Sequence, residues 1–191
     1  MPDFYTHLPL LSIAAKTMKK GGVIAYPTEG VWGLGCDPFN QCAVARLLSL
    51  KKRLPNKGVI LVAASIQQVD FLIHDLSAEQ QHRLNNTWPG PFTWIIPHKN
   101  RVPPWICGDH AGVAVRVSAH PVVNALCRLY GGAIVSTSAN PQALPAATSA
   151  WKVQRYFRND PRLDLITPGT IGKRARPSTI QDISSLAVIR R

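Results

Sequence analysis

Short apolar runs alternate with amphipathic segments along the chain. Apolar residues at helical spacing, or following a capping residue, predict helices at 10–18, 43–51, 66–73, 77–88, 122–130 and 149–157. Apolar runs bounded by glycine, proline or polar residues predict buried strands at 23–26, 58–64, 92–97, 113–117, 133–135, 163–166, 178–183 and 186–189. Residues 100–111 are expected to form a long surface loop. Because strands and helices mostly alternate without a long linker, we expect a single α/β domain with one sheet over residues 1–191.

Two polar turns directly follow predicted strands. Pro27-Thr28-Glu29-Gly30 follows strand 23–26, and Ser136-Thr137-Ser138-Ala139-Asn140 follows strand 133–135. In open α/β sheets, ligands bind just beyond the ends of the strands. Thr28, Glu29 and the hydroxyl and amide side chains of the second turn are therefore candidates for binding a ligand. Ordinary turn and capping chemistry is the alternative for both segments.

Cations crowd the connection between the helix at 43–51 and the next strand. Lys51, Lys52, Arg53 and Lys57 lie there with no acidic residue among them. Taken alone, they are typical of a solvated basic turn at a helix C-terminus. Placed between two polar turns, they are better interpreted as the phosphate side of a nucleotide site. Lys51 and Arg53 carry that prediction, and the other two are interpreted as flanking surface charge.

Arg116 lies inside the apolar run at 113–117. A cation in an apolar strand is costly unless it is paired. Arg116 either lies on the solvent face of a half-buried strand or meets a carboxylate or phosphate of a ligand, for which the guanidinium has a matching fork.

The overall charge is strongly positive, with 22 Lys+Arg against 10 Asp+Glu and a formal net charge of +12. This balance indicates an anionic partner such as nucleic acid or nucleotide, with simple solubility as the alternative. The cations are spread along the chain, which favours a folded basic surface over a disordered arm. Besides the cluster above they include Lys16, Lys19, Lys20, Lys173, Arg174 and Arg176.

Several classes of site and location are disfavoured. The cysteines 36, 42, 107 and 127 form no C-x-x-C pair, and the histidines show no metal spacing, so no protein-held metal site is predicted. No Walker loop, complete dinucleotide fingerprint or nucleophile elbow is present. We read no signal peptide and no run approaching the ~20 apolar residues of a membrane span. A cytoplasmic protein without membrane contact is expected.

Hydroxyls, an amide and cations at strand ends remain as the chemical groups. They suit a reaction whose nucleophile is already anionic, such as attack of a carboxylate-type oxygen on a nucleotide α-phosphorus. The protein would then position the reactants and neutralise charge. A Mg²⁺ ion would accompany the triphosphate, with few protein ligands.

The sequence resembles the YrdC/TsaC family of threonylcarbamoyl-AMP synthases, in its short single-domain form. The resemblance covers roughly residues 10–183. It rests on motifs that occur in the family's order, namely Pro27–Asp37, Lys51-x-Arg53, Ala114-Val115-Arg116, Ser136–Asn140 and Pro177-Ser178-Thr179-Ile180.

The resemblance implies a twisted, open, mixed α/β sheet with flanking helices and a basic concave face. It also implies that L-threonine, bicarbonate and ATP give threonylcarbamoyl-AMP and pyrophosphate, and that a separate transferase complex uses the product to modify adenosine 37 of tRNAs reading ANN codons. By motif, the site residues would be Lys51 and Arg53 (catalysis and ATP), Asn140 and Thr148 (ATP), and Thr28, Arg116, Ser138 and Ser178 (L-threonine).

The sequence departs from the family pattern at one place, and two alternative functions are also considered. The chain has Gln142-Ala143 where the family usually has Ser-Gly, which bears on the nucleotide contact there. A non-catalytic module that binds tRNA or double-stranded RNA would explain the positive charge, and RNA contact could also accompany catalysis. A related domain of hydrogenase-maturation proteins makes a carbamoyl adenylate instead, but its companion domains are missing here.

Overall fold

The computed structural model describes residues 8–172 and 178–190. The late cations Lys173, Arg174 and Arg176, together with Pro177, lie outside the described residues. The described chain forms a nine-stranded sheet in the order β7-β1-β2-β6-β3-β5-β4-β8-β9. The strands are β1 (Ile24–Pro27), β2 (Trp32–Gly35), β3 (Ile60–Ala63), β4 (Phe92–Pro97), β5 (Gly112–Val117), β6 (Ile134–Ser138), β7 (Leu165–Ile166), β8 (Thr179–Asp182) and β9 (Val188–Arg190).

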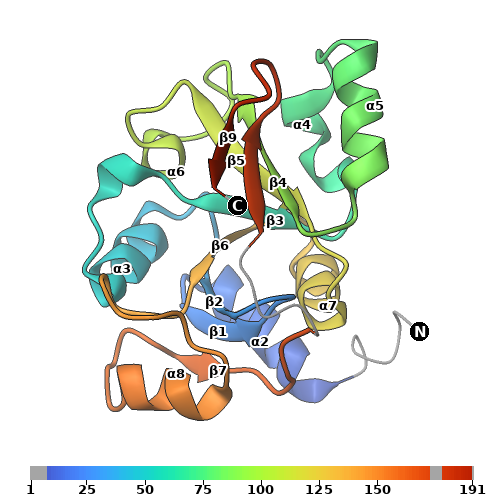
Figure 1. Cartoon of the computed structure of the whole chain (residues 1–191). Helices are drawn as coiled ribbons and strands as arrows, with labels where there is room; N and C mark the ends of the chain where they lie inside the picture. The colour runs from blue at the N-terminus through green and yellow to red at the C-terminus, as the bar shows by residue number, and fades with distance from the viewer. Residues whose placement is uncertain (1–7, 173–177, 191) are drawn as a thin grey trace.

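The sheet is mixed. Parallel pairs join β1 to β7, β3 to β5 and β4 to β8, and the other neighbouring strands are antiparallel. The helices are α2 (Pro9–Lys19), α3 (Gln41–Lys51), α4 (Asp70–Ile73), α5 (Ala78–Thr87), α6 (Pro104–Cys107), α7 (Pro121–Tyr130) and α8 (Ala150–Phe157), with 3-10 turns at Pro55–Lys57 and Ile66–Val69. Figure 1 shows α8 and β7 at one end of the molecule, and α5 and the β8–β9 hairpin at the other. The predicted α/β class with one sheet is confirmed.

The two faces of the sheet bury different cores. In β5, Val113, Val115 and Val117 are buried, whereas the residues between them are only partly buried. The valines join the larger core with α3, α5 and α8, and a second core forms where α2 and α7 pack on the opposite face. Since α2 and α7 cover only part of that face, the alternate residues of the central strands remain free to line a site.

The structure differs from the predicted elements in the segment after the first polar turn. Residues 32–35 form strand β2, although glycines disfavour strands. A Cβ at Gly35 would lie 2.5 Å from the Val135 carbonyl oxygen and 2.7 Å from the Tyr26 ring, so the close approach of neighbouring strands requires glycine there. Tertiary packing therefore overrides the local propensity of this segment.

Three other segments also differ from prediction. Ser136–Ser138 extend β6 instead of forming a turn, because β6 pairs with both β2 and β3. The helix predicted at 66–73 divides into a 3-10 turn and the short α4. The predicted loop at 100–111 contains α6, which begins at Pro104.

Helix α3 begins at the predicted N-cap. The Asn40 side-chain oxygen accepts a hydrogen bond from the Ala43 backbone N–H at 3.0 Å. We expect Asn40→Ala to lower the free energy of unfolding by about 1 kcal/mol, and Asn40→Gly by only a few tenths of that, because glycine is tolerated at this position. Urea denaturation measures both variants, and equal losses would contradict the capping role.

Candidate active site

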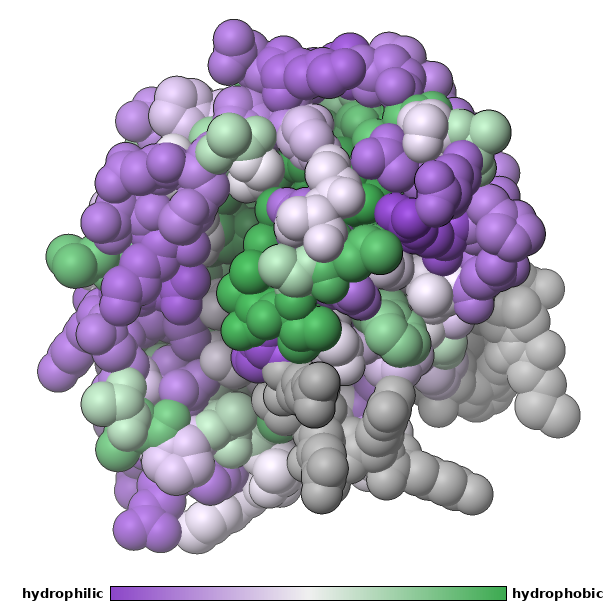
Figure 2. All heavy atoms as spheres, turned by 45° about the horizontal axis from the view of Figure 1, so that its top comes forward, coloured by the Kyte–Doolittle hydropathy of each residue, from purple (hydrophilic) through white to green (hydrophobic). Residues whose placement is uncertain are grey.

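A cavity of about 500 Å³ lies on the face of the sheet that α2 and α7 leave open. Its floor is apolar and includes Ile60, Ile95, Ile106 and Ile180. Figure 2 shows a hollow with hydrophobic residues inside and mostly hydrophilic residues around it. The cavity volume falls in the range of small-molecule sites, which combine apolar walls with a few polar groups that fix orientation.

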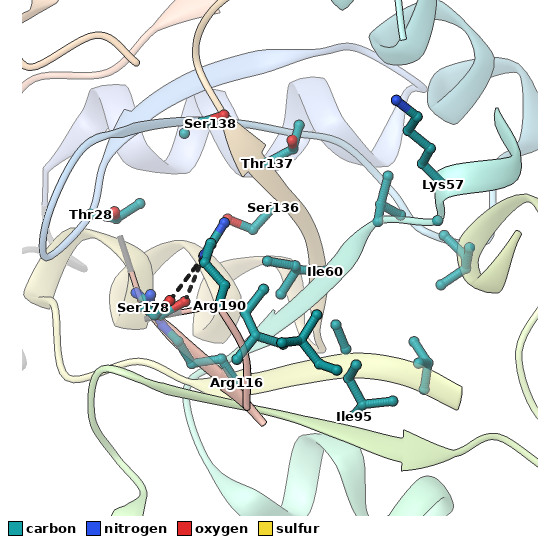
Figure 3. Close-up of a pocket in the computed structure, with 18 of the residues that line it drawn as sticks. Thr28, Lys57, Ile60, Ile95, Arg116, Ser136, Thr137, Ser138, Ser178 and Arg190 are labelled. Carbon is teal, nitrogen blue, oxygen red and sulfur yellow. Dashed lines mark hydrogen bonds between the residues drawn. The ribbon is translucent and has the colours of Figure 1, made fainter. Parts of the chain in front are cut away.

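Hydroxyl groups from three separate segments reach this cavity. Thr28, Ser138 and Ser178 line it, as do Ser136 and Thr137 of β6 (Figure 3). The Thr28 hydroxyl donates to the Val31 carbonyl oxygen at 2.7 Å, which closes the turn after β1. The Ser178 and Thr93 hydroxyl oxygens lie 2.8 Å apart. The structure therefore brings together the three predicted hydroxyl residues.

Arg116 also lines the cavity, and its partner is an acid of this chain. It forms an ion pair with Glu29, and the two side chains are 11% and 16% exposed. The other Glu29 oxygen accepts bonds from the Ser118 hydroxyl at 2.8 Å and the Ala119 N–H at 3.1 Å. Glu29 thus orients Arg116, and the Arg116 Nε is buried without a hydrogen-bond partner among the described residues.

A second arginine, Arg190, reaches the same end of the cavity from β9. It donates from Nε and Nη2 to the Ser178 carbonyl oxygen, at 3.2 and 3.0 Å, and the contact with Ser178 is visible in Figure 3. Burial and the nearby Arg116 lower the pKa of the Arg190 guanidinium. Two guanidinium groups and the single carboxylate of Glu29, which is paired with Arg116, leave a positive environment that favours an anion.

Arg53 and Lys57 line another part of the cavity. Arg53 Nη2 donates to the Gly58 carbonyl oxygen at 3.0 Å, and its Nε is buried with no partner in the described part of the chain. Burial lowers the pKa of the Arg53 guanidinium. Lys57, interpreted from sequence as flanking surface charge, is exposed and also lines the cavity.

Lys51 does not line the cavity. It is only 3% exposed, and its ammonium group contacts the carbonyl oxygens of Ser138 and Asn140, the latter at 2.8 Å. Its own carbonyl oxygen accepts the Gln142 N–H at 2.8 Å. The last residue of α3 therefore holds the segment that follows β6.

Asn140 and Thr148 are likewise outside the cavity lining. The Asn140 amide nitrogen donates to the carbonyl oxygens of Pro141 and Leu144, which shapes the loop. Thr148 is exposed just before α8. Ala143, at the departure noted above, has φ +69°, a left-handed conformation that glycine adopts more easily.

Sequence reasoning missed part of the lining. Arg190 is brought to the cavity by the pairing of β9 with β8, and no local motif marks it. The apolar floor comes from strands β3, β4 and β8 and from helix α6, which are far apart in sequence, and none of its isoleucines was a candidate site residue.

The described residues contain no group of three or more histidine, cysteine, aspartate or glutamate side chains that could hold a metal ion. The cavity lining offers hydroxyls and cations, and the nearby Glu29 is already bonded to Arg116 and Ser118. These donors do not fit a protein-held divalent cation. None of the helices in the described part of the chain combines the length and hydrophobicity that crossing a membrane requires.

The buried ammonium of Lys51 gives a pH-dependent contribution to stability. Burial and the neighbouring Arg53 lower its pKa from 10.5 to about 8. Between these values the unfolded chain binds more protons than the folded chain. The stability of the wild type relative to Lys51→Met should therefore rise with pH across this interval, by on the order of 3 kcal/mol. Urea denaturation at stepped pH tests this, and a constant difference would contradict it.

Comparison with known proteins places these features in a family. The Sua5/YciO/YrdC family model, described as "Telomere recombination", matches residues 16–191. A protein of Saccharophagus degradans named threonylcarbamoyl-AMP synthase is 56% identical over 96% of this chain and 95% of its own length. A Pseudomonas aeruginosa protein of the same name is 53% identical, covering 93% and 94%.

A solved structure agrees with this assignment. The crystal structure of P. abyssi Sua5 complexed with L-threonine matches 93% of this chain with a TM-score of 0.86 and 31% identity, and this chain spans 52% of that longer protein. The predicted mixed sheet with flanking helices is confirmed. The chain belongs to the Sua5/YciO/YrdC family.

Proposed function

We propose that this protein is an L-threonylcarbamoyladenylate synthase, a nucleotidyltransferase that uses L-threonine, bicarbonate and ATP. The observation that carries the proposal is the 56% identity over 96% of the chain to a protein named threonylcarbamoyl-AMP synthase. The cavity supports it, because it combines hydroxyls and cations with an apolar floor.

The proposed reaction needs no nucleophilic side chain. Threonine and bicarbonate form a carbamate with loss of water, and a carbamate oxygen attacks the α-phosphorus of ATP. The bond from that phosphorus to the bridging oxygen breaks, and pyrophosphate leaves. The protein would orient the reactants and stabilise the developing negative charge, which is the main contribution that fixed cations and hydroxyls can make.

L-Threonine would bind at the end of the cavity where Arg116 lies. The free edge of the Arg116 guanidinium would pair with the substrate carboxylate, and Glu29 would hold that guanidinium in place. Thr28, Ser138 and Ser178 would bond the hydroxyl and carbamate groups. A charged bidentate pair of this kind provides both affinity and orientation.

ATP would occupy the remainder of the site. Arg53 would contact the phosphates directly. Lys51 and Asn140 would hold the segment 138–142 in place, and they would contact ATP themselves only if this segment rearranged when ATP bound. Thr148 would meet the nucleotide from the adjoining loop. A Mg²⁺ ion would enter as part of the ATP substrate, held by the phosphates.

The product would leave this protein as an activated donor. A separate transferase complex would pass the threonylcarbamoyl group to adenosine 37 of tRNAs reading ANN codons. We place the enzyme in the cytoplasm, because ATP and the tRNAs that receive the threonylcarbamoyl group are found there.

Pyrophosphate release should require both L-threonine and bicarbonate. The reaction cannot form its nucleophile when either is omitted. We expect release to fall to background in each omission, measured with purified protein in a coupled phosphate assay with degassed buffer. Release that continues at the full rate without threonine would contradict the proposed reaction.

Arg116→Lys should raise the KM for L-threonine while leaving the KM for ATP nearly unchanged. Lysine keeps a positive charge opposite Glu29 but lacks the fork, so kcat/KM for threonine should fall about tenfold to hundredfold. Steady-state kinetics measure the two constants separately. Arg83→Lys is the matched control, because Arg83 is ion-paired with Glu79 on α5 and does not line the cavity. Equal effects of the two variants would argue against substrate contact by Arg116.

A further inference from the structure

Helix α8 presents an aromatic and basic surface that the proposed reaction does not use. Val153 and Phe157 are buried and fix the helix against the core. On the outer side, Trp151 is 65% exposed, and the Arg155 guanidinium lies 5.5 Å from the centre of its ring. We call Trp151, Lys152, Arg155 and Arg158 the α8 surface.

A hollow adjoins this surface. It is lined by Trp151, Arg155 and Arg158 of the α8 surface together with apolar side chains such as Leu163 and Ile166. Among the residues that the structure describes, none lines both this hollow and the candidate active site. Figure 1 shows α8 beside β7, at the end of the sheet opposite the β8–β9 hairpin that closes the catalytic cavity.

The charge at this surface is unbalanced. Its acids are already neutralised, since Asp160 pairs with Arg162 and Asp164 pairs with Arg46. Lys152, Arg155 and Arg158 have no carboxylate partner in residues 8–172 and 178–190. The surface therefore has cations available for an anionic partner.

The geometry favours a nucleic acid over an acidic peptide. Trp151 and Arg155 are spaced at i and i+4, so they share one face of the helix, and Arg158 directly follows its last residue. An exposed indole beside a guanidinium offers a flat surface on which a base stacks, with a cation next to it for the phosphate. An acidic peptide would pair with the cations but has no need of the exposed ring.

We propose that the α8 surface binds single-stranded RNA, with a base stacked on Trp151 and flanking phosphates at Arg155 and Arg158. The choice of RNA over DNA rests on the proposed function, whose product serves tRNA modification. This RNA surface is separate from the candidate active site.

Fluorescence anisotropy with a labelled single-stranded oligoribonucleotide of about 12 nucleotides tests the proposal. Trp151→Ala should weaken binding about fivefold to hundredfold, with an unchanged salt dependence. Trp151→Tyr, which keeps a stacking ring, should retain most of the affinity. The double variant Arg155→Ala/Arg158→Ala should weaken binding and lower the slope of log affinity against log salt by about 1.4, the value for two phosphates of a single strand.

The matched control is Lys16→Ala/Lys20→Ala, which removes the same charge from exposed positions in α2 and just after it, on the opposite face of the sheet. Equal losses in the control would mean that only net charge matters and would overturn the proposal, as would wild-type affinity of Trp151→Ala. Equal binding of the matched single-stranded DNA would overturn the choice of RNA. If polyglutamate displaced the RNA from Trp151→Ala as strongly as from the wild type, the surface would be assigned to an acidic peptide.

Pyrophosphate release serves as a separate readout. The α8 variants should keep wild-type release rates, which also shows that they are folded. If the wild type released no pyrophosphate but bound RNA through Trp151, the proposed function would fail while the RNA surface stood. If release were normal and the variants bound RNA like the wild type, only the RNA surface would fail.

Discussion

The ion pair between Arg116 and Glu29 is the contact on which the site depends. It joins a central strand to the turn after β1, across 87 positions of the chain. The pair satisfies a cation that the apolar strand β5 could not otherwise hold. Glu29 is also bonded to Ser118 and Ala119, so its carboxylate is held by more than the arginine. Thr28, beside it in sequence, is positioned by the same turn.

The cavity separates its positive charges with an apolar floor. Arg116 and Arg190 lie together near Ser178, whereas Lys57 lies beyond Ile60 and Ile95 (Figure 3). Apolar walls exclude water and thereby strengthen each charge's interaction with a bound anion. A ligand with a carboxylate at one end and phosphates at the other matches this distribution, as threonine and ATP together do.

The sequence predicts most elements correctly because their signals are local. Phe92–Pro97 matches β4 at both ends, and the Asn40 cap marks the start of α3. Strand β2 escaped prediction because its glycines are required by neighbours that only the folded sheet supplies. Thr28 is a candidate because it lies in a polar turn directly after a buried strand, and Arg116 because it is a cation inside an apolar run; both line the cavity. Arg190 could not be predicted, since its position depends on strand pairing with β8.

The order of the site residues along the chain determines when the cavity can form during synthesis. Glu29 and Arg53 are synthesised early, but Ser178 and Arg190, which complete the cavity, come near the end of the sequence. At about 5–20 residues per second, the ribosome needs on the order of ten seconds to connect them. During that interval the part of the cavity that contains Arg53 and Arg116 lacks the wall formed by Ser178 and Arg190. Strand β1 likewise lacks its parallel partner β7 until residues 165–166 have been synthesised. A newly synthesised chain can therefore bind its ligands only after nearly all of its residues have been added.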